Sequence, residues 1–188
     1  VLLFIFIPGA LRAQSLFPEA GASYIGTERG ERLGYCLSPA GDVNGDGFND
    51  FLIATFHYNV GPYDRGACCL VLGKPKDQFS LNVSADLVDA RFIGDSEYDA
   101  IGFEVHAGDI NGDGYSDMII GAPAGAPSNP VPGYAYVVFG RQNIDWGTSA
   151  IITDHADIIF SGEHTYSTAG YSVSVIGDMD GDGCSEFL

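Results

Sequence analysis

One acidic motif occurs three times in this chain and constrains its fold more than any other feature. The copies are Asp42-Val-Asn-Gly-Asp-Gly-Phe-Asn-Asp50, Asp109-Ile-Asn-Gly-Asp-Gly-Tyr-Ser-Asp117 and Asp178-Met-Asp-Gly-Asp-Gly-Cys-Ser-Glu186, named acidic loops 1, 2 and 3. They begin 67 and 69 residues apart. So regular a period indicates a modular architecture, in which each loop occupies the same place in one structural unit.

The composition of the acidic loops is typical of a calcium site. Ca²⁺ prefers about six to eight oxygen ligands, several of them carboxylates, on a tightly turned backbone. Glycines such as Gly45 and Gly47 stand where that turn needs a positive φ. We predict one Ca²⁺ per loop, up to three in this chain, held by side chains at positions one, three, five and nine and by the carbonyl at position seven. These ligands are Asp42, Asn44, Asp46, Phe48 and Asp50 in loop 1, Asp109, Asn111, Asp113, Tyr115 and Asp117 in loop 2, and Asp178, Asp180, Asp182, Cys184 and Glu186 in loop 3.

Two alternatives to this assignment have different physical signatures. An EF-hand loop of about twelve residues ends in a bidentate Glu, but the twelfth positions here are Ile53 and Ile120. The apolar run after each loop is typical of a buried strand, whereas an EF-hand continues into an amphipathic helix. The second alternative is a solvated Asp-Gly turn without metal, which three copies in register argue against.

The residues around the loops repeat as well, and they predict an all-β fold. Gly34-Tyr35, Gly102-Phe103 and Gly170-Tyr171 precede the loops, and β-prone runs at 67–72 and 134–139 follow. Each unit thus reads as strand, acidic loop, strand, long loop, strand, long loop, strand. Four-stranded antiparallel blades repeated radially form a β-propeller, of which this chain would contain about two and a half blades. The predicted units are 27–94, 95–162 and the shorter 163–188.

This combination of motifs resembles the FG-GAP repeats of integrin α-subunit propellers and of many secreted bacterial proteins. The resemblance extends over roughly residues 22 to 188 and includes Gly121-Ala-Pro123 after the second loop. Unit one departs from the pattern, because Ala54-Thr-Phe56 replaces Gly-Ala-Pro. The resemblance implies a partial propeller over 14–188 with calcium loops. Because such propellers usually have about seven blades, we expect the chain to be an N-terminal fragment of a longer protein.

Charge and the N-terminal residues bear on location and partners. The net charge is −17, with 25 acidic residues against 8 basic ones, which argues against nucleic acids and anionic membranes as partners. Residues 1–7 are apolar and Leu11-Arg-Ala13 follows, so 1–13 is interpreted as a signal-peptide remnant, with a hydrophobic N-terminal strand as the alternative. Seven apolar residues are too few to span a membrane. We therefore expect a secreted or cell-surface protein, or a periplasmic one if it is bacterial.

The four cysteines show no spacing typical of a metal site or of a disulfide framework. Cys68 and Cys69 belong to one predicted strand, so their side chains are expected on opposite faces as buried free thiols. Cys36 and Cys184 lie at non-equivalent places in different units, and no disulfide between them is predicted.

The resemblance also implies where function lies. In the integrin-like family the calcium loops line one face of the disc, and ligands engage the opposite face, named the loop face. Carried onto this sequence, the candidate residues of the loop face are Tyr58, Tyr63, Arg65, Tyr98 and Tyr166. Aromatic residues with a few charges are typical of recognition surfaces, and the alternative is that these are ordinary exposed residues.

No catalytic residue is predicted in this chain. The sequence contains no Gly-x-Ser-x-Gly elbow, no His-Glu-x-x-His pair and no phosphate-binding loop. We therefore expect a calcium-binding adhesion module for a protein or glycan ligand. The alternatives are the propeller portion of a secreted hydrolase or lyase whose catalytic residues lie elsewhere, and a structural scaffold within a larger cell-surface protein.

Overall fold

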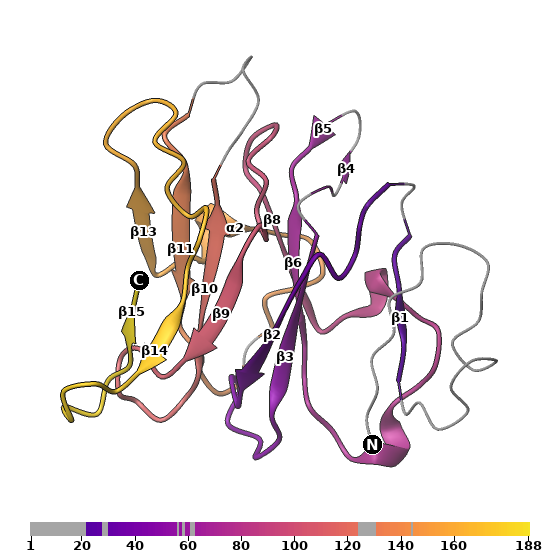
Figure 1. Cartoon of the computed structure of the whole chain (residues 1–188). Helices are drawn as coiled ribbons and strands as arrows, with labels where there is room; N and C mark the ends of the chain where they lie inside the picture. The colour runs from indigo at the N-terminus through magenta and orange to yellow at the C-terminus, as the bar shows by residue number, and fades with distance from the viewer. Residues whose placement is uncertain are drawn as a thin grey trace.

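Short antiparallel strands make up most of the chain. The computed structural model describes residues 22–27, 30–55, 57, 59–60, 63–123, 131–143 and 145–188, with the backbone alone at 59, 60, 63 and 64. The segment 1–13, interpreted as a signal-peptide remnant, lies outside the described residues. Two complete blades and the first hairpin of a third follow one another along the chain (Figure 1). The predicted fold class, a partial β-propeller with four-stranded antiparallel blades, is confirmed.

The two blades have the same strand order. Each begins with its first strand at one edge, and the next three strands add successively and antiparallel. Blade 1 consists of β2 (Cys36–Gly41), β3 (Asp50–Thr55), β6 (Ala67–Val71) and β8 (Ala90–Ile93). Blade 2 consists of β9 (Val105–Gly108), β10 (Asp117–Ala122), β11 (Tyr134–Val138) and β13 (Ile158–Ser161), and blade 3 opens with β14 (Val175–Gly177) and β15 (Glu186–Phe187).

The second strands of blades 1 and 2 are apolar on both faces because each is buried between neighbouring layers. Leu52 of β3 joins Met118 of β10 in the core between blades 1 and 2. The next residue, Ile53, points the other way and packs with Tyr24. Strand periodicity explains this alternation, since successive side chains lie on opposite faces. Cys68 and Cys69 alternate in the same way, and both are buried free thiols as predicted.

The Gly-aromatic motifs of successive units contact one another. The ring centroids of Tyr35 and Phe103 lie 5.6 Å apart, and those of Phe103 and Tyr171 lie 4.7 Å apart. Both pairs are tilted, and these separations are within the range favoured by aromatic side chains. One aromatic side chain from each unit therefore joins the blades in series.

Short parallel strands add a second connection between neighbouring units. β12 (Ala150–Ile151), in the connection between β11 and β13 of blade 2, pairs in parallel with β8 of blade 1. β7 (Val83–Ser84), at the equivalent place in blade 1, pairs in parallel with β1 (Tyr24–Ile25). These pairings were not predicted from the sequence. In each case a strand of one unit pairs with the strand that comes directly before that unit in the chain, β8 for β12 and β1 for β7.

The remaining elements lie in the connections between strands. These are the two-residue strands β4 (Asn59–Val60) and β5 (Tyr63–Asp64), the 3₁₀ turns η1 (Lys76–Gln78) and η2 (Ala85–Leu87), and the four-residue helix α2 (Ile152–His155). None of the helices in the described part of the chain has the length and apolar composition needed to cross a membrane.

The acidic loops and the β4–β5 hairpin lie at opposite ends of the blades. Acidic loops 1, 2 and 3 connect β2 to β3, β9 to β10 and β14 to β15, and all three turns are at the lower end in Figure 1. The β4–β5 hairpin is at the upper end. The strands between them hold the two ends apart.

Candidate functional site

Each acidic loop is folded around the carboxylate at its first position. In loop 1, Asp42 Oδ1 accepts hydrogen bonds from the N–H groups of Gly45 (2.7 Å) and Asp46 (3.1 Å), and Oδ2 accepts one from Gly47 (2.8 Å). Gly45 and Gly47 have φ values of 73° and 88°, a conformation that glycine adopts at little cost. Asp109 accepts the equivalent three bonds in loop 2, and Asp178 accepts from Gly181 and Gly183 in loop 3.

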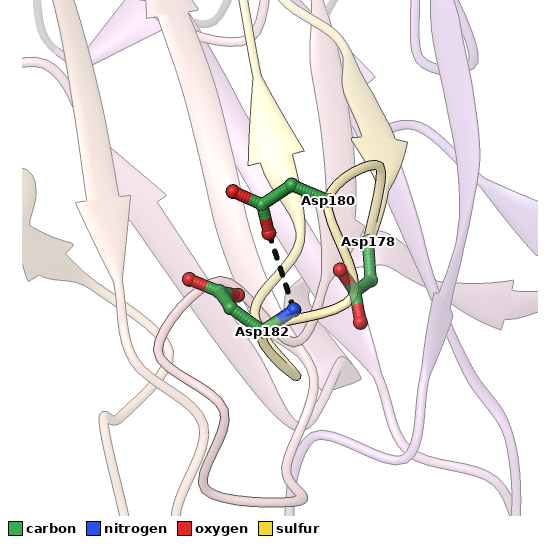
Figure 2. A group of neighbouring side chains, drawn as sticks. All are labelled: Asp178, Asp180 and Asp182. Atoms are coloured by element: carbon green, nitrogen blue, oxygen red, sulfur yellow. Dashed lines mark hydrogen bonds between the residues drawn. The ribbon is translucent and has the colours of Figure 1, made fainter.

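The third and fifth positions complete the turn and bring further oxygens to the same place. In loop 3, Asp182 N–H donates to Asp180 Oδ1 over 3.1 Å, as Figure 2 shows. One carboxylate oxygen from each of Asp178, Asp180 and Asp182 lies within 4.8 Å of the other two. The third position is Asn44 in loop 1, and its Oδ1 accepts the Asp46 N–H over 3.1 Å, so the turn has the same form.

The donor set of these loops fits a hard divalent cation. Asp178, Asp180 and Asp182 offer only oxygen atoms, and all three side chains are exposed. Carboxylates gathered this closely repel one another unless a positive charge lies between them. Oxygen-only donors gathered at one tight turn are the chemistry that Ca²⁺ accepts.

The ninth position has a structural role that was not predicted from the sequence. Asp50 and Asp117 are buried, and their carboxylates accept backbone hydrogen bonds from two directions. Asp50 Oδ2 accepts from Val43 N–H (2.8 Å) inside the loop, and Oδ1 accepts from Gly73 N–H (2.7 Å) beyond β6. Each such carboxylate therefore ties an acidic loop to the end of the third strand of its blade.

Asp117 makes the same connection in blade 2. Its Oδ2 accepts from Ile110 N–H (2.8 Å), and its Oδ1 accepts from Gly140 N–H (2.9 Å) beyond β11. Burial raises the pKa of both Asp50 and Asp117, and the backbone N–H groups partly offset that rise. In loop 3, Glu186 Oε2 accepts the Met179 N–H over 2.7 Å.

The structure describes only part of the predicted loop face. Tyr98 is 40% exposed and Tyr166 is 62% exposed, and each lies on the connection that leads into a new blade. Arg65 is half-buried, and its carbonyl accepts the Ile101 N–H over 3.2 Å. Tyr58 lies outside the described residues, and of Tyr63 only the backbone, in β5, is described. Tyr98 and Tyr166 are therefore the candidate tyrosines whose side chains are described.

One polar residue in each inter-blade connection folds back on its own loop, and it was not predicted from the sequence. Glu31, Asp99 and Ser167 each accept a backbone hydrogen bond from the residue three or four positions earlier, over 2.6, 2.6 and 3.1 Å. Each is flanked on both sides by residues with positive φ. All three stand three positions before the glycine of a Gly-aromatic pair, and that fixed offset is the signal that could have identified them.

Asp99 is the most unusual member of this set. Only 4% of the residue is exposed, and its carboxylate accepts the Ser96 N–H. Burial, with the nearby Asp95 charge, raises the pKa of Asp99 to about 6, while the Ser96 N–H and the Arg65 charge act in the opposite direction. Tyr98, which precedes Asp99 in the sequence, is therefore an exposed side chain next to a buried one.

Comparison with known proteins finds similarity to the FG-GAP repeat and to two kinds of much longer protein. A family profile described as the FG-GAP repeat matches residues 102–138. Integrin alpha pat-2 of Caenorhabditis elegans is 27% identical over 173 residues, which cover 85% of this chain and 13% of that protein. Phosphatidylinositol-glycan-specific phospholipase D of Rattus norvegicus is 29% identical over 188 residues, which cover 97% of this chain and 21% of that protein. The chain thus spans a small part of the length of these relatives.

Proposed function

This chain is an FG-GAP repeat protein with an integrin-α-like propeller fold, and from that premise we propose that it is a calcium-stabilised binding module. The acidic loops brace one end of the blades, and the loop face at the other end binds a protein or glycan ligand. The observation that carries this proposal is the gathering of Asp178, Asp180 and Asp182 oxygens within 4.8 Å around one tight turn.

The proposed ligands in each loop are the side chains at positions one, three, five and nine and the carbonyl at position seven. In loop 2 these are Asp109, Asn111, Asp113, Asp117 and the Tyr115 carbonyl. A bound Ca²⁺ would neutralise the repulsion among these oxygens, and part of its binding free energy would appear as folding stability. The residues at positions one and three already hold the turn through backbone N–H groups, which limits the reorganisation that binding requires.

The loop face is the proposed surface for a protein or glycan partner. Tyr98 and Tyr166 are exposed aromatic residues at equivalent places in successive units. Exposed tyrosines offer a large apolar area and a polar hydroxyl at small entropic cost, which suits recognition. The net charge of −17 disfavours nucleic acids as partners. We place the protein outside the cell or at its surface, or in the periplasm if it is bacterial.

A second candidate function is the propeller portion of a secreted hydrolase or lyase. The similarity to phosphatidylinositol-glycan-specific phospholipase D over 97% of this chain favours this alternative. In that case the catalytic residues lie outside residues 1–188. The sequence of the whole protein distinguishes the two, because a catalytic domain favours the enzyme, and further repeats with a membrane anchor favour adhesion.

Calcium titration tests the proposed function. Isothermal titration calorimetry of the full-length protein is expected to give about one ion per acidic loop, and thermal melts are expected to show a higher Tm in calcium than in chelator. The absence of binding would make the loops plain Asp-Gly turns and would reopen their carboxylates as candidates for chemistry.

A further inference from the structure

Neighbouring acidic loops are hydrogen-bonded to each other. Ser116, at position eight of loop 2, donates its N–H to the carbonyl of Asp42 in loop 1 over 3.0 Å. Ser185, at position eight of loop 3, donates to the carbonyl of Asp109 in loop 2 over 2.7 Å. The two bonds are equivalent, and each joins position eight of one loop to position one of the loop before it.

The side chain at position seven adds a packing contact to each bond. Tyr115 of loop 2 lies so close to Gly45 of loop 1 that a Cβ built on Gly45 would collide with its ring. Cys184 of loop 3 covers Gly112 of loop 2, where a built Cβ would lie 3.0 Å from Sγ. The glycine at position four therefore serves two purposes, since it permits the turn and also accepts the side chain of the next loop.

A third link joins loops 1 and 2 through the residues that follow β11. Gly140 N–H donates to Asp117 Oδ1 of loop 2 over 2.9 Å, and Arg141 N–H donates to the Val43 carbonyl of loop 1 over 2.9 Å. Two consecutive amide groups thus hold a carboxylate of one loop and a carbonyl of the other. A short stretch of backbone therefore connects the two loops directly.

We propose that the acidic loops bind their ions cooperatively, with Tyr115 and Cys184 as the residues that position each loop against the one before it. This inference rests on the proposed calcium binding and adds how the sites act together. Ser116 lies between the proposed ligands Tyr115 and Asp117 of loop 2. Its N–H donates to the carbonyl of Asp42, which is a proposed ligand of loop 1. An ion in loop 2 fixes these residues and so lowers the entropic cost of ordering loop 1. By linkage, an ion in loop 1 favours loop 2 by the same factor.

The test compares one-loop and two-loop variants of the full chain by calorimetric calcium titration. Asp182→Ala disables loop 3 and leaves loops 1 and 2. Adding Asp113→Ala leaves loop 1 alone, and adding Asp46→Ala leaves loop 2 alone. We expect the product of the two association constants in the two-loop variant to exceed the product of the single-loop constants by about fivefold or more. A ratio near one overturns the proposal.

Variants at position seven identify which contact carries the coupling. In the two-loop background, Tyr115→Ala is expected to bring the ratio close to one, whereas Tyr115→Phe keeps the ring over Gly45 and retains the ratio. Ile159→Ala removes an exposed apolar side chain of β13 and serves as the matched control. An unchanged ratio in Tyr115→Ala overturns the role of this residue.

The same experiment separates failure of the coupling from failure of calcium binding. If the unaltered chain binds no calcium, the metal assignment itself fails, and the coupling fails with it. If all single-loop variants bind but the ratio stays near one, the metal assignment stands and only the coupling is overturned. Circular dichroism melts of every variant in chelator show whether a lost ratio reflects unfolding.

Discussion

At the residue scale, Asp113 and Asp117 look alike in sequence but differ in the fold. Asp113 is exposed, and its carboxylate accepts from the N–H of Tyr115 and the side-chain amide of Asn111 in its own loop. Asp117 is buried, and its carboxylate accepts from the Ile110 N–H in its own loop and from the Gly140 N–H beyond β11. The carboxylate of Asp113 thus bonds within its own loop, whereas that of Asp117 also joins the loop to the end of β11.

We expect Asp113→Ala and Asp117→Ala to differ in their dependence on calcium. Asp113→Ala should weaken calcium binding and lower the Tm in calcium, with little effect in chelator, and Asp46→Ala should do the same in loop 1. Asp117→Ala should lower the free energy of unfolding by at least about 2 kcal/mol in both conditions, because it leaves buried N–H groups without an acceptor. Thermal melts in calcium and in chelator check this, and equal losses for Asp113→Ala in both conditions would contradict the assignment.

The raised pKa of Asp99 makes the stability of the fold depend on pH. Its folded pKa of about 6 lies above the usual value of 3.8 for this side chain. Between these values the folded protein keeps a proton that the unfolded chain releases, so the carboxyl costs stability as pH rises. The cost is absent at low pH and is complete above about pH 6.

We therefore expect Asp99→Asn to gain stability relative to the unaltered protein as pH rises from about 4 to 7. The asparagine stays neutral and keeps an oxygen that can accept the Ser96 N–H. The difference between the two free energies of unfolding should change by up to about 3 kcal/mol, since one pKa unit corresponds to about 1.4 kcal/mol. Denaturant titrations in chelator at several pH values measure it, and a difference that is constant with pH would refute the buried ionisation.

At the scale of the elements, the parallel pairing of β12 with β8 joins blades 1 and 2 on the outside. Trp146 lies four residues before β12, is 7% exposed, and packs edge-on against Phe92 of β8 with ring centroids 5.9 Å apart. This contact places a residue of blade 2 in the core shared with blade 1. Blades 1 and 2 are thus joined here by an apolar contact, Trp146 against Phe92, as well as by the short β12–β8 pairing.

Trp146→Ala is expected to lower the free energy of unfolding by about 3–5 kcal/mol, because it leaves a cavity against Phe92. Trp146→Phe keeps an aromatic ring there and should lose less than half as much. Circular dichroism during denaturant titration is the suitable measurement, since Trp146 is the single tryptophan of the chain. A loss below about 1 kcal/mol for Trp146→Ala, on the order of an exposed substitution, would show that the contact between Trp146 and Phe92 contributes little to stability.

At the scale of the whole molecule, the two ends of the blades carry different chemistry. The acidic loops meet at the lower end in Figure 1, and the β4–β5 hairpin is at the upper end. Tyr98 belongs to the connection between β8 and β9. Acidic loop 2 follows at the other end of β9. Substitutions at distant sites that share no partners usually have additive effects, so changes at one end need not reach the other.

Tyr98→Ala is accordingly expected to leave calcium affinity unchanged within the error of calorimetry while altering binding at the loop face. The matched comparison is Asp113→Ala, which should weaken calcium binding. Joint loss of calcium affinity and ligand binding in Tyr98→Ala, in a variant that melts normally in chelator, would contradict the separation of the two ends.

The sequence by itself determined the blade pattern and the acidic loops, because both are recorded over short spans of residues. Alternating apolar residues assign Cys68 and Cys69 to opposite faces, and Asp42 folds its loop through bonds to residues at most five positions away. The four-strand repeat follows from its own period. Local patterns of this kind can be read without knowing what lies nearby in space.

Only the tertiary structure decided how the units hold one another. Ala150 pairs with Phe92, and Ser116 donates to Asp42, between residues that are far apart along the chain and whose types do not reveal the pairing. The structural role of Asp117 could not be predicted for the same reason, since its partner Gly140 is 23 residues away. Such contacts are fixed by where the blades bring backbone amide groups in space, and a sequence records the residue types but not that proximity.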